Sequence, residues 1–251
     1  MTATAAAKKI FPTSGEPFLE ITREGPLFIV TMVDNENRFT TESCQAICDA
    51  LDHITAVVED EELTEAAVVT RGQDKFYSNG LHIEKAFSVP GFTDDIFMPM
   101  LNKVLLFGLP TVACINGHAF AGGCLLALAH DYRVMRSDRG FMCMPLIDVI
   151  QNEIDLPSPL PSGMSALIRY KLPHHVYRSV VLEAKRYAGK AALEDHMVDA
   201  IAEGVEGTFE LAKQVALKLA PKAKAGAFFG MIKEDMYPEA SSYLMSGKAK
   251  L

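Results

Sequence analysis

The sequence lacks any apolar run long enough to cross a membrane. Its longest such stretch, Ala119 to Ala129, contains two glycines and lies between His118 and His130. That length falls well short of the roughly 20 residues that a membrane-spanning helix needs. The first nine residues also lack the basic, apolar and cleavage segments of a signal peptide and the arginines of a transit peptide. We therefore expect neither a membrane span nor secretion.

Basic residues are scarcer than acidic ones. The chain of 251 residues has 24 Lys and Arg against 32 Asp and Glu, a formal net charge of −8. General nucleic-acid binding requires a basic surface, so this charge balance argues against it. With 49% hydrophobic and 22% charged residues, the composition is typical of an ordinary globular protein rather than a disordered or fibrous one.

Cysteines and metal-binding motifs are also few. The five cysteines are odd in number and lie in apolar or helical contexts, which favours buried reduced thiols over a disulfide framework. A reducing compartment follows from that interpretation. The seven histidines form no His-Glu-x-x-His motif, and there is no Cys-x-x-Cys. We therefore expect no metal site.

Strand-like and helix-like segments alternate through the first two thirds of the chain. The pattern predicts strands at 18–22, 27–33, 66–70 and 111–115, and helices that begin at an N-cap Thr41 and near residue 93. From Ser162 onward the pattern is almost entirely helical. This order indicates an α/β chain, in which ligands normally bind at the loops that follow the strands.

Two of those loops carry unusual glycines. The segment from Asn116 to Ala127 places paired small residues between a strand and a helix, which leaves the first backbone N–H groups of that helix available to a developing negative charge. The loop from Lys75 to Ile83 follows another strand and also contains a glycine. Together the two loops could supply the two donors of an oxyanion hole. The alternative is that these glycines only allow close packing of helix and strand.

The two loops make the chain resemble the crotonase, or enoyl-CoA hydratase/isomerase, superfamily. Similar proteins have a Phe-x-x-Gly-x-Asp/His-type loop, which the segment from Phe76 to His82 resembles, and an Asn-Gly-x-x-x-Gly-Gly segment that matches Asn116 to Cys124. Asp131-Tyr132 then precedes the next strand, and the helical stretch from Leu182 to Asp199 resembles the family phrase that ends in Val-Asp. The resemblance covers nearly the whole chain.

The resemblance implies a fold and a substrate class. It implies a ββα-spiral core with the acyl-CoA site over residues 1–161, and a C-terminal helical region over 162–251 that forms a homotrimer or hexamer. It further implies that a coenzyme A thioester is the substrate, with no separate cofactor.

The resemblance also assigns residues to the site. The oxyanion-hole amides fall on Asn79 and Gly122, and further substrate contacts fall on Ser78, Gly80, Leu81, Gly123 and Leu125. In the hydratases a glutamate occupies the position of Leu125. Because adding water takes groups that orient and deprotonate it, this departure argues against a hydratase of the standard type.

The remaining candidate acid is Glu153. Isomerase-like members have an Asn/Ser-Glu-x-x-Leu phrase, which Asn152 to Leu156 matches if residues 145–151 are an insertion. Glu153 is then the single catalytic base, because one carboxylate can move a proton from C2 to C4 of an enoyl thioester. In the alternative register Leu146 occupies the acid's place and the site is inert.

These features predict an isomerase that converts 3-enoyl-CoA into trans-2-enoyl-CoA in fatty acid β-oxidation. Two alternatives stay open: a hydratase-like enzyme of a peroxisomal biosynthetic pathway, and an inactive acyl-CoA-binding protein. The C-terminal residues Ala249-Lys250-Leu251 are a variant of the Ser-Lys-Leu signal that the peroxisomal import receptor binds. We therefore expect a peroxisomal location.

Overall fold

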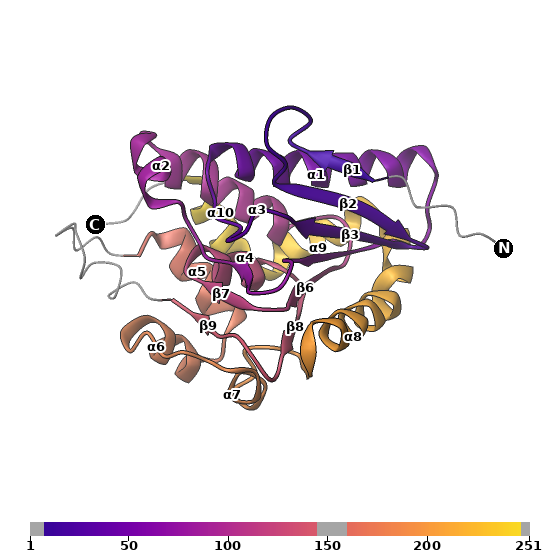
Figure 1. The fold of residues 1–251 in the computed structure, drawn as a ribbon. Coiled ribbons are helices and arrows are strands. Elements are labelled where there is room, and N and C mark those ends of the chain that lie inside the picture. Colours follow the sequence, from indigo (N-terminus) through magenta and orange to yellow (C-terminus); the bar gives the residue numbers. More distant parts are fainter. Residues whose placement is uncertain (1–7, 145–159, 247–251) are drawn as a thin grey trace.

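A seven-stranded mixed sheet lies at the centre of the computed structural model, which describes residues 8–144 and 160–246 (Figure 1). The strands are ordered β1-β2-β3-β4-β6-β8-β10. The first three pair antiparallel and the others pair parallel. They span Lys9–Phe11 (β1), Leu19–Glu24 (β2), Leu27–Met32 (β3), Ala67–Arg71 (β4), Thr111–Ile115 (β6), Tyr132–Arg136 (β8) and Ala200–Ala202 (β10).

A second, smaller sheet carries the segments that lead to the candidate site. It consists of three short parallel strands in the order β5-β7-β9. These strands are Phe76–Ser78 (β5), His118–Phe120 (β7) and Met142–Cys143 (β9). The sequence pattern places β5 and β7 in loops, because strands of three residues are too short to produce a periodic signal.

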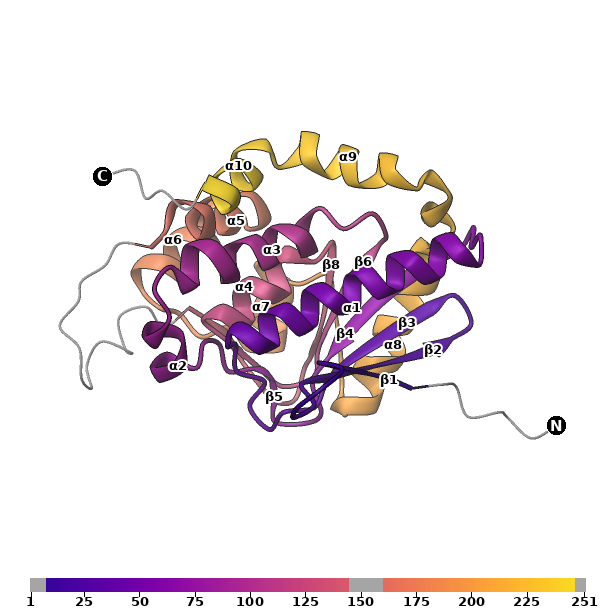
Figure 2. The same cartoon turned by 90° about the horizontal axis from the view of Figure 1, so that it is seen from above.

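Helices cover both faces of the large sheet (Figures 1 and 2). Helix α8 (Gly204–Leu219) packs its Phe209, Ala212 and Ala216 against one face. Helices α1 (Thr41–Asp60), α3 (Met98–Leu105) and α4 (Gly122–Ala129) contribute to the larger core on the other face. The described part therefore has an α/β architecture in which the sheet separates two apolar layers.

The N-terminal hairpin and the first long helix agree with the sequence prediction. Strands β2 and β3, which match the expected strands at 18–22 and 27–33, pair antiparallel from Leu19↔Met32 to Glu24↔Leu27 around a turn at Gly25 and Pro26. The N-cap of α1 is Thr40, not Thr41 as expected. The Thr40 side chain accepts the Ser43 N–H while the Ser43 hydroxyl accepts the Thr40 N–H, a reciprocal capping box.

The remaining helices extend the core toward the C-terminus. The helix expected to begin near residue 93 is divided into a π-helical segment η1 (Phe92–Phe97) followed by α3. One strand, β10, lies within the region expected to be helical. The other helices are α2 (Ile83–Ser88), α5 (Ser162–Lys171), α6 (His174–Leu182), α7 (Gly189–Glu194), η3 (Ala220–Ala225), α9 (Ala227–Met236) and α10 (Pro238–Ser246). No helix within 8–144 or 160–246 is long and apolar enough to cross a membrane.

A buried chain of hydrogen bonds joins the two sheets. The Tyr77 and Thr70 hydroxyls lie 2.8 Å apart, and Thr70 Oγ1 lies 2.9 Å from His130 Nε2. His130 Nδ1 lies 2.8 Å from the Leu126 carbonyl oxygen. A neutral imidazole satisfies both contacts if Nδ1 donates and Nε2 accepts. Burial lowers the pKa of His130 to about 4.

The lowered pKa of His130 makes stability depend on pH. Because the unfolded chain takes up the proton near pH 6.5 and the folded chain only near pH 4, stability falls as the pH decreases through that range. The loss at pH 4 is on the order of 3 kcal/mol. We expect urea unfolding of His130→Gln to depend less on pH between 6.5 and 4 than the wild type does. Parallel stability curves for the two proteins would contradict this account.

Candidate active site

The two glycine-containing segments meet where the small sheet ends. Strand β5 leads into Asn79 and Gly80, and strand β7 leads into Ala121 and Gly122. A methyl group on Gly80 would lie 2.9 Å from the Phe120 carbonyl oxygen and 3.1 Å from the Gly122 nitrogen. The two backbones are therefore packed against each other, and Gly80 has the positive φ of +81° that glycine adopts without strain.

Gly122 begins helix α4 with a strained residue before it. Ala121 has φ 46° and ψ −114°, a conformation that is unfavourable for a residue with a Cβ. Its N–H donates to the Cys143 carbonyl at 2.9 Å, which ties the turn to β9. Among the described residues, the Gly122 N–H has no hydrogen-bond acceptor. It is one of the first-turn donors that a helix leaves open to an anion.

The Asn79 amide is already engaged in this structure. Its N–H donates to the Glu36 carbonyl at 2.9 Å, and its side-chain Nδ2 donates to the Glu36 carboxylate at 3.1 Å. Hydrogen bonds from Arg38 and Asn79 lower the pKa of Glu36, which favours its charged form. The loop at 34–38 therefore covers the first expected oxyanion donor. A ligand that uses this donor has to displace the Glu36 carbonyl.

The expected substrate contacts take different positions. Ser78 is fully buried, and its hydroxyl donates to the Asn37 carbonyl at 2.7 Å and accepts the Gly80 N–H at 3.2 Å. The Leu81 carbonyl accepts from Arg38. Gly123 packs directly on the Ser78 backbone, and Leu125 is 2% exposed within the apolar core. The structure brings Ser78, Gly80 and Gly123 together, while Leu125 joins the core.

Aromatic side chains that sequence reasoning did not select surround Gly122. A methyl group at Gly122 would lie 3.0 Å from Phe97 Cζ and 3.2 Å from Phe39 Cδ2. The Phe39 and Phe97 rings are 5.4 Å apart, and both are fully buried. Neither residue lies in one of the glycine motifs, so spacing gives no signal for them. Their effect is an apolar, water-poor environment at this amide.

The candidate base lies outside the described residues. Glu153, the presumed insertion at 145–151, Leu146 and the C-terminal Ala249-Lys250-Leu251 all fall in the ranges 145–159 and 247–251. Within the described ranges, no group of three or more His, Cys, Asp or Glu side chains could hold a metal ion.

The fold and the paired loops define a class of protein. The structure has the crotonase fold, as solved structures of similar proteins do. An enoyl-CoA isomerase of Mycobacterium tuberculosis is 20% identical with a TM-score of 0.74, covering 92% of this chain and 95% of that one. An enoyl-CoA hydratase of Mycobacterium marinum has the same identity and TM-score, covering 92% and 96%. Because one of these equally similar structures is named an isomerase and the other a hydratase, and both are only 20% identical to this chain, the likeness establishes only the fold.

Sequence comparison establishes the family. The enoyl-CoA hydratase/isomerase family model matches residues 23–248, so the chain belongs to that family. The peroxisomal enoyl-CoA delta isomerase 2 of Arabidopsis thaliana is 30% identical over 234 residues, which cover 88% of this chain and 93% of the relative. Family membership implies an acyl-CoA substrate.

Proposed function

We propose that the protein is a Δ3,Δ2-enoyl-CoA isomerase that acts in fatty acid β-oxidation. The observation that carries this proposal is Leu125, a buried apolar residue in the first turn of α4 where the hydratases have a glutamate. The position that supplies one of the two hydratase carboxylates is therefore apolar in this chain. A single base is sufficient for moving a double bond.

The reaction needs only a proton transfer and an anion site. A carboxylate removes a proton from C2 of the 3-enoyl thioester, and the negative charge is delocalised onto the thioester oxygen as a dienolate. Return of a proton to C4 gives the conjugated 2-enoyl thioester, so atoms and charge balance without water. In this proposal Glu153 carries the proton. The amides of Asn79 and Gly122 stabilise the dienolate oxygen.

The anion site requires one hydrogen bond to be exchanged. Gly122 supplies an open donor at the N-terminus of α4, whereas Asn79 first has to exchange its bond to the Glu36 carbonyl for one to the thioester oxygen. The buried rings of Phe39 and Phe97 lie beside Gly122, and this apolar environment strengthens the hydrogen bond that the Gly122 amide donates.

A cleft beside the same loop is large enough for the polar part of a coenzyme. It has a volume of about 680 Å³ and is bordered by Arg38, His82 and Lys85, together with the acids Glu16, Asp34 and Glu42. We assign the phosphates of coenzyme A to the side of this cleft where Lys85 and Arg38 lie, with Arg38 also paired to the Glu36 carboxylate.

An activity assay tests the proposed function. Purified protein incubated with 3-hexenoyl-CoA is expected to yield 2-hexenoyl-CoA, detected by the ultraviolet absorption of the conjugated thioester. Saturable binding of the substrate without turnover would support the binding-protein alternative instead. Water addition to 2-hexenoyl-CoA as the main activity would support the hydratase.

The proposed location is the peroxisome, through Ala249-Lys250-Leu251. A fluorescent protein fused to the N-terminus is expected to give puncta that coincide with a peroxisomal marker. Deletion of Leu251 should make the fluorescence diffuse, because the receptor reads the terminal residue. Puncta that survive this deletion would show that the tail is not the signal.

We also propose a homotrimer or hexamer. In support, helix α9 exposes a row of large apolar side chains, and Lys233 is the buried residue of that helix. These exposed residues are Phe228, Met231, Ile232 and Met236. An apolar helix face of this kind is typical of a subunit interface.

A further inference from the structure

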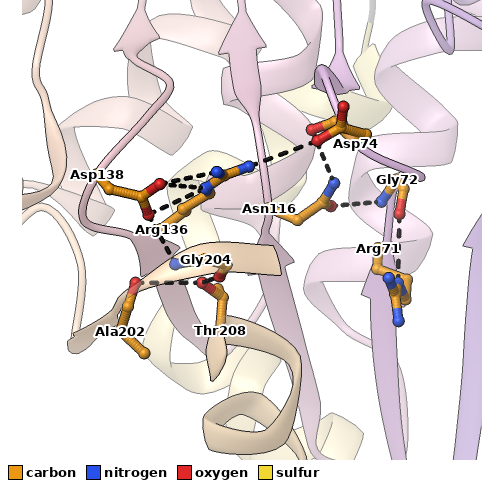
Figure 3. A network of polar contacts seen from close by, with 9 residues as sticks. All are labelled: Arg71, Gly72, Asp74, Asn116, Arg136, Asp138, Ala202, Gly204 and Thr208. Carbon is orange, nitrogen blue, oxygen red and sulfur yellow. Dashed lines mark hydrogen bonds and ion pairs between the residues drawn. The ribbon is translucent and has the colours of Figure 1, made fainter. Parts of the chain in front are cut away.

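Asn116 connects the two segments that carry the proposed oxyanion donors. It follows β6, is fully buried, and its side chain reaches across to the loop that follows β4 (Figure 3). Asn116 Oδ1 accepts the Gly72 N–H at 2.8 Å, and Nδ2 donates to the Asp74 carbonyl at 3.3 Å. One amide group therefore holds both ends of the turn between β4 and β5.

We propose that Asn116 is a positioning residue that sets the spacing between the Asn79 and Gly122 amides. This inference rests on the proposed function. The loop that Asn116 holds leads through β5 to Asn79. The chain that continues from Asn116 leads through β7 to Gly122. The side chain thus fixes the common start of both segments.

The backbone of the loop at 72–75 packs tightly against the backbone at Gly117 and His118. The His118 N–H donates to the Lys75 carbonyl at 2.9 Å, which begins the pairing of β5 with β7. A methyl group at Gly117 would lie 2.3 Å from the Lys75 carbonyl oxygen and 2.5 Å from that of Asp74. Because the two backbones are in direct contact, a shift of the loop at 72–75 is transmitted to both strands.

Asparagine has the chemistry that this position needs. The side chain has to accept one hydrogen bond from an N–H and donate one to a carbonyl, and the amide does both. Aspartate has the same size and can still accept the Gly72 N–H, but its carboxylate oxygen would face the Asp74 carbonyl without a donor. Asn116→Asp therefore removes one of the two contacts while it keeps the volume.

The outer part of the same network provides a matched control. Arg136 Nη2 bonds Asp138 Oδ2 at 2.7 Å, and Asp138 Oδ1 accepts the Gly204 N–H at 2.7 Å at the start of α8 (Figure 3). Arg136 also reaches the Asp74 side chain at 3.4 Å. These contacts are largely exposed and bind side chains rather than the loop backbone. Asp138→Asn should therefore leave the spacing of the amides unchanged.

The test measures carbonyl polarisation, which a purely structural role would not affect. The probe is 2,4-hexadienoyl-CoA, whose absorption moves to longer wavelength when hydrogen bonds polarise its carbonyl. We expect Asn116→Asp to lose most of this shift while the dissociation constant of the probe changes less than about threefold. With 3-hexenoyl-CoA its kcat should fall about 10²-fold, because misplacement of about 1 Å has that cost, and its KM should change little. Asp138→Asn should retain both the shift and kcat.

Three results separate the possible explanations. The role of Asn116 would be overturned if Asn116→Asp kept the absorption shift that the probe shows with the wild type. It would also be overturned if both variants lost the absorption shift in proportion to the decrease in their melting temperatures. If Asn116→Asp does not fold, Asn116→Ser is measured in the same way, with the same expected loss of shift and the same refuting outcome. A wild-type protein that binds the probe without any shift would refute the oxyanion hole and with it the proposed function. A wild-type shift without isomerase activity would refute the proposed function alone.

Discussion

Substitution of the proposed base, Glu153→Gln, is expected to lower kcat for 3-hexenoyl-CoA by roughly 10²–10⁴-fold, the usual contribution of one general acid/base. Glutamine keeps the size and hydrogen-bonding capacity of the side chain but cannot carry the proton. Since the carboxylate acts mainly in the transition state, KM should change far less than kcat. Steady-state kinetics on the purified variant give both constants.

The control for this variant lies a few residues away. Asp148→Asn also replaces an acid by its amide, but within the presumed insertion at 145–151, and it should leave kcat nearly unchanged. Full activity in Glu153→Gln would contradict the register that includes the insertion. It would also favour the alternative register, in which Leu146 occupies the position of the acid.

The second large effect is expected from alanine at two adjacent glycines of α4. A methyl group at Gly123 would lie 2.3 Å from the Ser78 carbonyl oxygen, a backbone atom that cannot move alone. At Gly122 the nearest atoms are 3.0 and 3.2 Å away, at the edges of the Phe97 and Phe39 rings. Gly123→Ala should therefore lower the free energy of unfolding by about 1–3 kcal/mol or more.

Gly122→Ala should lower activity rather than stability. The rings can shift by a few tenths of an ångström, so folding is retained, but the methyl group crowds the proposed oxyanion donor. We expect kcat to fall about 10²-fold, as when one oxyanion donor is lost, with a near-normal melting temperature. Thermal unfolding and kinetics on both variants check this contrast. An active Gly122→Ala enzyme would contradict the assignment of that amide.

The elements with a strong periodic pattern are the ones that sequence predicts. Strands β2 and β3 lie where the pattern predicts them, and α1 has a long apolar face. The one-residue error at its N-cap arose because both Thr40 and Thr41 are good capping residues. Only the reciprocal bond with Ser43 distinguishes them.

The contacts within the site could not be predicted, because they join residues far apart in sequence. The Asn79 N–H bonds the Glu36 carbonyl, and Gly122 is approached by Phe39 from the segment before α1 and by Phe97 from η1. No local sequence pattern specifies these long-range contacts. The three residues of β10 are half-buried, and their composition gives no signal for a strand. Only the pairing with β8 identifies the segment as one. Close backbone packing at the glycines of both loops could be predicted, since such packing requires a residue without a side chain.

The most direct test of the central claim follows 3-hexenoyl-CoA by NMR in D₂O with the wild-type enzyme. A single-base isomerase removes hydrogen from C2 and returns hydrogen or deuterium to C4. The account therefore predicts that 2-hexenoyl-CoA forms first and that any deuterium it carries lies at C4 or C2. Glu153→Gln should slow both conversion and labelling by the same roughly 10²–10⁴-fold. Direct formation of a 3-hydroxyacyl product, or bound substrate that stays unlabelled and unconverted, would contradict the account.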